Sequence, residues 1–140
     1  MTIPVDQRLG LDIKRAEQHL MSAKSGALRD LDLSVAAYAA LLAIDRTPGI
    51  SPAGLARECL VTPQAINSVL KTLTERGLVE RTPHPWLRHA TETTLTDQGR
   101  TVLAEADERA GSVEQRLADA FTPQERETLR RLLARAAEAL

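Results

Sequence analysis

Two helix starts that lie close together constrain the fold of this chain more than any other feature. Ser51-Pro52 and Thr62-Pro63 each place a hydroxyl side chain at a helix N-cap and a proline at the first helical position. The hydroxyl can accept from an unpaired N–H of the first turn, and proline loses nothing there because that N–H would have no partner. We therefore predict a short helix from Pro52 to about Cys59, a tight turn over residues 60–62, and a longer helix from Pro63 to Arg76.

The periodicity changes after the second of these helices. Gly77 suits a C-terminal helix cap, and residues 78–82 and 90–95 then predict two strands, the second rich in β-branched side chains. Pro83-His84-Pro85 interrupts the first strand, so the two segments form a hairpin. A short helix, a tight turn, a longer helix and a hairpin are the successive parts of a winged helix-turn-helix.

Amphipathic helices are predicted on both sides of this unit. The first covers Asp6 to Lys24, with Gly26 just beyond it, and a nearly all-apolar helix follows from Leu33 to Asp45 with Asp32 as its N-cap. After the hairpin a helix is expected from Thr96 to about Ala118. The last helix opens with the capping box Thr122-Pro123-Gln124-Glu125. The three outer helices carry apolar stripes, which are Leu9, Ile13, Ala16, Leu20 and Ala23; Val102, Ala106, Ala110, Val113 and Leu117; and Leu129, Leu132, Leu133, Ala136 and Leu140.

The composition agrees with one mainly α domain over residues 1–140. The chain has 140 residues, of which 43% are hydrophobic and only 2% aromatic, so aliphatic side chains must fill a single core. One cysteine excludes an internal disulfide framework, and no apolar run is long enough for a membrane span. The N-terminus lacks the features of a signal peptide, so we expect a cytoplasmic protein without a membrane partner. The net charge of -1 gives no general indication of nucleic-acid binding.

The helix from Pro63 to Arg76 has two faces of different chemistry. Ile66, Val69, Leu70 and Leu73 point inward, whereas Gln64, Asn67, Ser68 and Lys71 follow the i, i+3, i+4, i+7 spacing of the opposite face. Gln and Asn can pair with adenine, Ser with several bases, and Lys with guanine or phosphate. Thr62, Pro63 and the free N–H groups of the helix start form a candidate phosphate site. This face therefore predicts contact with double-stranded DNA, the alternative being an ordinary solvated helix face.

Several segments together resemble the DNA-binding core of MarR-family transcriptional regulators. They are Leu55-Ala56, Val61 to Asn67, the "ERGLVER" run from Glu75 to Arg81, and the "LTxxG" pattern from Leu95 to Gly99. The resemblance implies a homodimer built from residues 1–30 and 100–140, with a winged helix-turn-helix lobe over residues 31–99. It also implies repression through a pseudo-palindromic operator, often with release by a small ligand or an oxidant.

The predicted wing departs from the family pattern. Family wings carry Asp-x-Arg ahead of the "LT" pair, where this chain has Leu87 and His89 with Arg88 between them. The resemblance implies that the arginine enters the minor groove, a role that Arg88 could take if the hairpin slips by one residue, or His89 if it is protonated. Arg81 and His84 are further basic candidates on the hairpin.

An apolar aromatic, Trp86, is expected at the wing tip. It could pack against a sugar or base edge in the minor groove. The alternative is that it folds back on Leu87 and anchors the loop.

The resemblance also points to an effector crevice between the dimer helices and the lobe. His19 and Tyr38 could line it, although a core tyrosine with a satisfied hydroxyl is the alternative.

Cys59 is predicted to be a small core residue rather than a redox sensor, because it follows Leu55 on the inward face of its helix.

The remaining sequence features argue against other classes of protein. The three histidines show no metal-ligand spacing, and no glycine-rich phosphate loop or nucleophile elbow is present, so we expect neither a metal, nor a cofactor, nor an enzyme. A winged-helix module that binds proteins without specific DNA binding is the alternative function.

Overall fold

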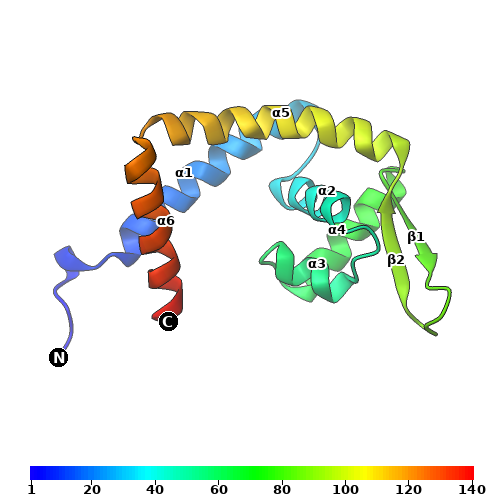
Figure 1. Ribbon diagram of the computed structural model, residues 1–140, viewed down its shortest axis with the longest axis horizontal. Coiled ribbons are helices and arrows are strands. Elements are labelled where there is room, and N and C mark those ends of the chain that lie inside the picture. The colour runs from blue at the N-terminus through cyan, green and yellow to red at the C-terminus, as the bar shows by residue number, and fades with distance from the viewer.

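The structure is a computed structural model that describes all 140 residues. It is mainly α-helical with one antiparallel hairpin, as predicted (Figure 1). In chain order the elements are α1 (Gly10–Leu28), α2 (Val35–Arg46), α3 (Pro52–Glu58), α4 (Pro63–Glu75), β1 (Val79–Pro83), β2 (Thr91–Leu95), α5 (Asp97–Asp119) and α6 (Pro123–Glu138), with 3-10 turns at Val5–Gln7 and Arg29–Leu31. None of the helices is long and apolar enough to cross a membrane.

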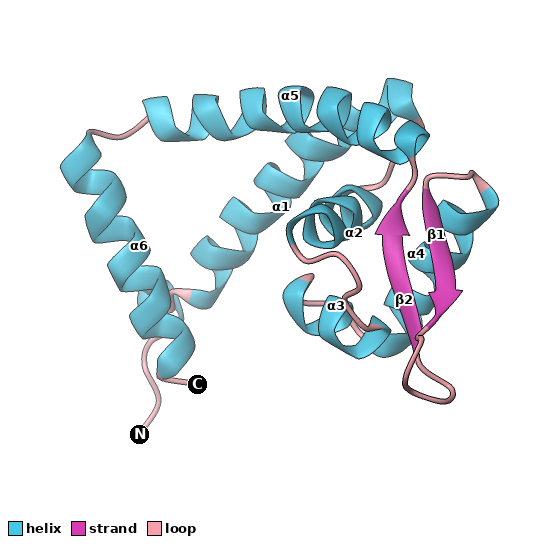
Figure 2. Cartoon of the chain, turned by 45° about the vertical axis from the view of Figure 1, so that its right-hand side comes forward, coloured by secondary structure: helices cyan, strands magenta, loops and turns pink.

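The helices divide between a lobe and an arm, and the arm consists of α1, α5 and α6. Helices α2, α3 and α4 and the hairpin form the lobe, which lies below one end of α5, and α1 packs along α5 (Figure 1). At the other end of α5 the chain turns, and α6 runs down on the same side of α5 as the lobe but apart from it (Figure 2). In the lobe, α4 packs against α2 and α3, and the hairpin lies at the edge beside α4.

Hydroxyl side chains cap five of the helices. Ser51, Thr62 and Thr122 accept from the N–H three residues later, as predicted from their Ser-Pro and Thr-Pro pairs, and Thr96 caps α5 in the same way. The cap predicted for α2 was wrong. Ser34 accepts from Ala37 N at 3.0 Å, because its backbone is extended as an N-cap requires. Asp32 instead closes the preceding 3-10 turn with a φ of 50°.

The first helix is displaced from its predicted position by four residues. It begins at Gly10 instead of Asp6, and it continues through Gly26 to Leu28 instead of ending at Lys24. Leu28 is fully buried in the core of the lobe. Burying a leucine stabilises the fold by about 2 kcal/mol, which exceeds the roughly 1 kcal/mol penalty of a glycine inside a helix.

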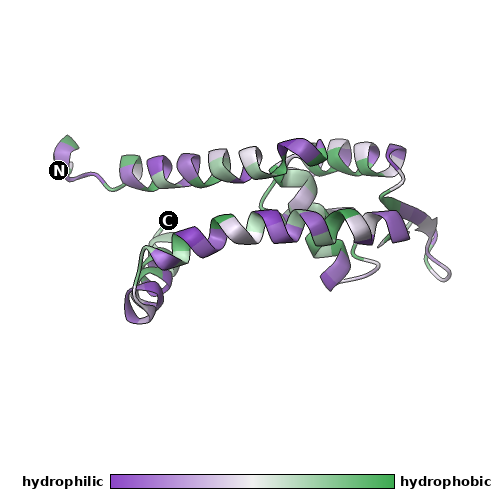
Figure 3. Ribbon diagram, turned by 90° about the horizontal axis from the view of Figure 1, so that it is seen from above, coloured by the Kyte–Doolittle hydropathy of each residue, from purple (hydrophilic) through white to green (hydrophobic).

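The core lies within the lobe and beneath the adjoining part of α5. Its large, fully buried side chains are Leu28, Leu41, Ile44, Leu55, Ile66, Leu70, Leu73, Leu78 and Val79. By contrast, the predicted stripes near the start of α1 and along α6 are mostly exposed, and α6 has no buried residue. Figure 3 shows apolar stretches recurring along both of these helices. The apolar residues near the start of α1 and along α6 are therefore mostly uncovered within this chain.

Two glycines allow backbone segments to approach the hairpin closely. Gly49, at a φ of 83°, donates its N–H to Thr93 O at 3.0 Å and so attaches the α2–α3 loop to β2. Gly99, in the first turn of α5, lies against the backbone of Leu78. A Cβ at residue 99 would lie 1.9 Å from Leu78 O. The hairpin is thus held at fixed positions by both α5 and the α2–α3 loop.

Candidate nucleic-acid interface

Helix α4 presents the predicted polar face to solvent. Ile66, Leu70 and Leu73 are buried and Val69 is half-buried, so these four side chains fix the rotation of the helix. The opposite side chains, Gln64, Asn67, Ser68 and Lys71, are all exposed. The structure therefore brings these four candidates together on one face.

The turn between α3 and α4 is tight because one residue adopts a left-handed conformation. Leu60 has a φ of 55°, and Val61 N donates to Ala56 O at 3.1 Å. Leu60 is 92% exposed, so no packing compensates for this conformation. This conformation could not be predicted from a leucine, because glycine or asparagine is the usual residue at such a position.

The start of α4 has fewer free donors than predicted. The Thr62 side chain accepts from Ala65 N at 3.1 Å, Ile66 N donates to Thr62 O at 3.0 Å, and Pro63 has no N–H. Gln64 N–H and the Thr62 hydroxyl proton remain for an anion at the positive end of the helix. A phosphate at this point would therefore meet two donors.

An arginine that the sequence reasoning did not single out holds the other end of α4. The Arg76 guanidinium donates to Asp32 O at 2.7 Å and to Leu31 O at 3.1 Å. Both carbonyls belong to the turn between α1 and α2, far away in sequence. The position of α4 is thus tied to the segment that links the arm to the lobe.

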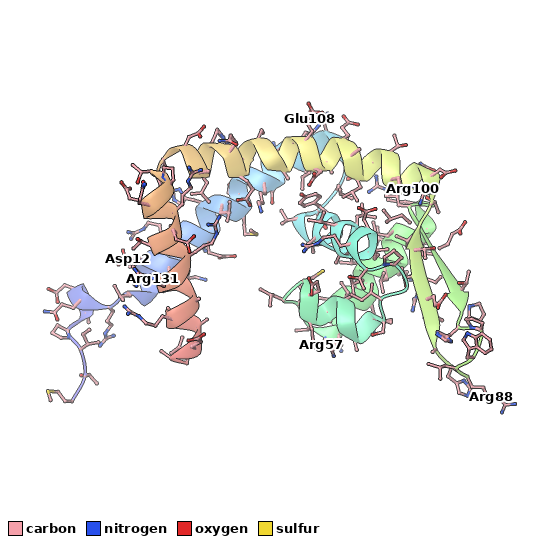
Figure 4. The ribbon with its side chains drawn as sticks, viewed as in Figure 1. Asp12, Arg57, Arg88, Arg100, Glu108 and Arg131 are labelled. Carbon is pink, nitrogen blue, oxygen red and sulfur yellow. The ribbon has the colours of Figure 1, made fainter.

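The two arginine candidates on the hairpin occupy different positions. Arg81 is exposed on β1, and its Nη2 is 3.5 Å from Thr91 Oγ1 on β2. Arg88 lies at the far end of the loop and points away from the lobe (Figure 4). Figure 4 also places Arg57 of α3 along the same lower edge of the lobe, a basic residue that the sequence analysis omitted. The exposed α4 face and both hairpin arginines belong to the same lobe.

His84 has a structural role in the wing that the sequence did not reveal. Its Nδ1 accepts from the backbone N–H groups of Trp86 and Leu87, each at 3.1 Å. Its Nε2 is 3.5 Å from Glu92 Oε1 on the opposite strand. His84 therefore connects the tip of the loop to β2 and organises the wing.

The two effector candidates lie apart from the cavities of the lobe. The Tyr38 hydroxyl donates to Asp107 Oδ1 of α5 at 2.6 Å, and Tyr38 itself is buried. Burial, followed by this hydrogen bond and the charges of Asp107 and Glu114, raises the pKa of Tyr38 well above its usual range. His19 is exposed on α1.

Two cavities adjoin these helices without including either candidate. One of about 300 Å³ lies between α2 and α5 and is lined by Leu42, Asp45, Arg100, Leu103, Ala104 and Asp107. Another of about 370 Å³ lies between the end of α1 and α4 and includes Arg29 and Arg76. Asp107 links the first cavity to Tyr38.

Cys59 packs against the core at the end of α3 and is half-buried. Burial, followed by the nearby charge of Glu58, raises the pKa of its thiol. A raised pKa lowers the fraction of reactive thiolate at neutral pH, which favours the interpretation as a packing residue.

Comparison with known proteins connects this geometry to a family. The sequence model of the MarR family matches residues 31–85, which span α2 to the wing loop. The transcriptional repressor Rv2887 of Mycobacterium tuberculosis is 35% identical over 133 residues, covering 94% of this chain and 96% of the repressor. The chain belongs to the MarR family. The predicted family and the predicted mainly α winged helix-turn-helix fold are both confirmed.

Solved structures of MarR-family proteins share this arrangement over almost the whole chain. CouR bound to a 23-mer DNA duplex has a TM-score of 0.86 at 27% identity, covering 98% of this chain and 99% of CouR. An E. coli MarR variant complexed with operator DNA has a TM-score of 0.84 at 27% identity, covering 91% and 92%. Rv2887 with salicylic acid has a TM-score of 0.74 at 30% identity, covering 96% and 99%.

Proposed function

We propose that this MarR-family protein is a repressor that binds a pseudo-palindromic DNA operator as a homodimer and is released by a small ligand. The observation that carries the proposal is the exposed face of α4, where Gln64, Asn67, Ser68 and Lys71 are held outward by three buried side chains on the other face. Such a face fits the major groove, because amide and ammonium groups can reach base edges and phosphates there.

The accessible surface of the single chain supports a dimer. A compact monomer of 15.3 kDa exposes about 7,100 Å². This chain exposes 10181 Å², and the surplus includes the apolar stripes of α1 and α6. Packing of these stripes against a second copy would cover them, and it would place two α4 helices on one DNA duplex.

The arrangement of the lobe and arm occurs in relatives that bind DNA. The TM-scores are 0.86 with CouR bound to a DNA duplex and 0.84 with the E. coli MarR variant complexed with operator DNA. These likenesses support the proposal that the chain binds DNA.

The proposal is tested by fluorescence anisotropy with labelled duplexes from the region upstream of the gene, at several salt concentrations. We expect tight binding with a steep salt dependence and a clear preference over a scrambled duplex. A selection from random duplexes covers the case of a distant operator. If neither source yields a preferred site, the alternative of a protein-interaction module is correct.

Two substitutions on α4 separate general affinity from sequence reading. Lys71→Ala should weaken binding to every duplex and reduce the salt slope by about 1.8, because one phosphate contact is lost in each subunit of the dimer. Asn67→Ala should reduce the preference for the operator more than the general affinity. The matched control is Lys14→Ala, on the exposed side of α1 away from its apolar stripe, which should leave both properties unchanged. Normal binding by both α4 variants would show that the wrong face has been chosen.

For the ligand, the junction of α2 and α5 is the proposed site. Tyr38 and Asp107 join the lobe to the arm there, and the cavity of about 300 Å³ adjoins Asp107. A ligand that separates this pair would free the lobe to change its angle to α5. Salicylate, the ligand of a relative, is the first compound to add to the protein–DNA complex, with Tyr38→Phe and His19→Ala compared with the wild type. Release that is identical in all three proteins would place the ligand elsewhere.

A further inference from the structure

The wing ends in an apolar tip that the rest of the molecule does not cover. Trp86 is 86% exposed and Leu87 is 59% exposed. The other two aromatic residues behave differently, since Tyr38 is buried and Phe121 is half-buried. The alternative in which Trp86 folds back into the protein is therefore not the one adopted. An exposed tryptophan beside an exposed leucine is a surface that gains free energy when a partner covers it.

The loop holds this tip in one place before any partner arrives. His84 accepts from the N–H groups of both Trp86 and Leu87, and His84 N in turn donates to Ala90 O at 2.9 Å. The backbone bond from His84 to Ala90 extends the hairpin ladder past the last strand pair, Pro83 and Thr91. A tip whose backbone is already ordered loses less conformational entropy on binding.

The charges around the tip identify the chemistry of the partner. Residues 81–91 contain two arginines and no acidic residue, and the adjoining Glu92 has its Oε1 3.5 Å from His84 Nε2. Arg88 points outward beside the tip (Figure 4), and Arg81 is exposed on the adjoining strand. An apolar tip among positive charges fits a polyanion that also offers an apolar surface. The minor groove of DNA is such a surface, with phosphates along its edges and deoxyribose rings along its walls.

We propose that Trp86 and Leu87 enter the minor groove beside the α4 site, with the indole packed against the deoxyribose wall and Arg88 on a phosphate. The inference rests on the proposed function, because it assumes that the lobe is bound to DNA through α4. It assigns the wing contact to an apolar residue, Trp86. The family pattern would place a charged residue at the next position, which here is Leu87.

Trp86 is the only tryptophan of the chain, so its fluorescence tests the proposal directly. The wild-type protein is titrated with its operator duplex, with excitation selective for tryptophan, while a label on the DNA reports binding by anisotropy. We expect the emission to move to shorter wavelength and quenching by acrylamide, a neutral quencher, to fall several-fold at saturation. If anisotropy rises while emission and quenching stay unchanged, the wing tip remains in water and the inference is wrong. If no duplex binds, both this inference and the proposed function fail.

Substitutions give an independent measurement. Trp86→Ala should weaken operator binding by on the order of ten-fold, as loss of an aromatic contact with a nucleotide does elsewhere. The slope of log affinity against log salt should stay unchanged, because no charge is removed. Arg88→Ala should lower that slope by about 1.8, because each of the two wings loses one phosphate contact. Trp86→Phe serves as the conservative control and should retain most of the affinity. Wild-type affinity in Trp86→Ala would overturn the proposal, and equal unfolding midpoints would show that the variants are folded.

Discussion

Leu60 carries a local backbone strain without any compensating contact. Its φ of 55° lies in the left-handed region, which costs most residues other than glycine about 1 kcal/mol. The side chain of Leu60 is exposed. Asparagine tolerates this region much better. We therefore expect Leu60→Asn to raise the free energy of unfolding by about 0.5–1 kcal/mol, measured by urea denaturation at a fixed protein concentration. Leu60→Ala has no polar side chain to hydrogen-bond the local backbone and should change little, so equal stability of the two variants would contradict this explanation.

Tyr38 links stability to alkaline pH. Its pKa is raised in the folded protein by burial and by the hydrogen bond to Asp107, so folding favours the neutral phenol. This contribution is fully present below the ordinary tyrosine pKa of 10.0, and it is lost as the pH rises above that value toward the folded pKa. Tyr38→Phe should lower the free energy of unfolding by about 1 kcal/mol at pH 7.

The difference between Tyr38→Phe and the wild type should shrink as the pH is raised above 10.0, the ordinary value for tyrosine. Thermal or urea unfolding of both proteins at neutral and alkaline pH measures it. A constant difference across this range would mean that the hydroxyl is not responsible.

At the scale of elements, the contact between α5 and the hairpin depends on the missing side chain of Gly99. A β-carbon there would lie 1.9 Å from a backbone oxygen, Leu78 O, which a side-chain rotation cannot relieve. We expect Gly99→Ala to cost about 3 kcal/mol, at the upper end of single substitutions, as α5 and β1 are forced apart. Gly26→Ala is the control. It lies within α1 with open space around it, and it should stabilise the helix by up to about 1 kcal/mol in the same denaturation experiment.

The elements predicted well from the sequence are those whose structure depends on residues close to one another in the chain. The N-caps of α3, α4 and α6 and the direction of the α4 face follow from residues within one or two helical turns. The start and end of α1 were misplaced because Leu28, which extends the helix, acts through the core of the lobe. Asp32 and Ser34 both suit an N-cap, and only the backbone conformation decides between them.

Within the candidate site, the contacts between distant segments could not be predicted. Arg76 bonds to carbonyls of residues 31 and 32, and His84 bonds to the loop only in one ring orientation. Neither pairing leaves a periodic pattern in the sequence. The exposed face of α4, by contrast, depends only on helical spacing, and it was placed correctly.

At the scale of the whole molecule, the unpartnered stripe of α6 predicts its response to substitution. Leu129 and Leu133 are 37% and 50% exposed and take no part in the core of the lobe. If they pack against a second copy, the double variant Leu129→Asp/Leu133→Asp should sediment as a monomer with the helical content of the lobe retained. Its operator affinity should fall steeply, since one lobe then reads only one half-site.

The control for this experiment is Arg131→Ala, on the opposite side of α6, which should sediment like the wild type. Figure 4 shows Arg131 on α6, at the end of α5 opposite to the lobe. A dimeric double variant would place the subunit interface away from this stripe, and the proposal for the dimer would need another surface.

The absence of any buried side chain on α6 has a consequence for the turnover of the protein. A helix of 16 residues without a buried side chain is only marginally stable in water, so in a separated subunit α6 is held mainly by its own backbone bonds. It is also rich in arginine, the residue after which trypsin cleaves. Subunits that lose their partner would fray at this end and become protease substrates. The lifetime of the protein would then rise with its concentration, which would favour the removal of unpaired chains over that of assembled dimers.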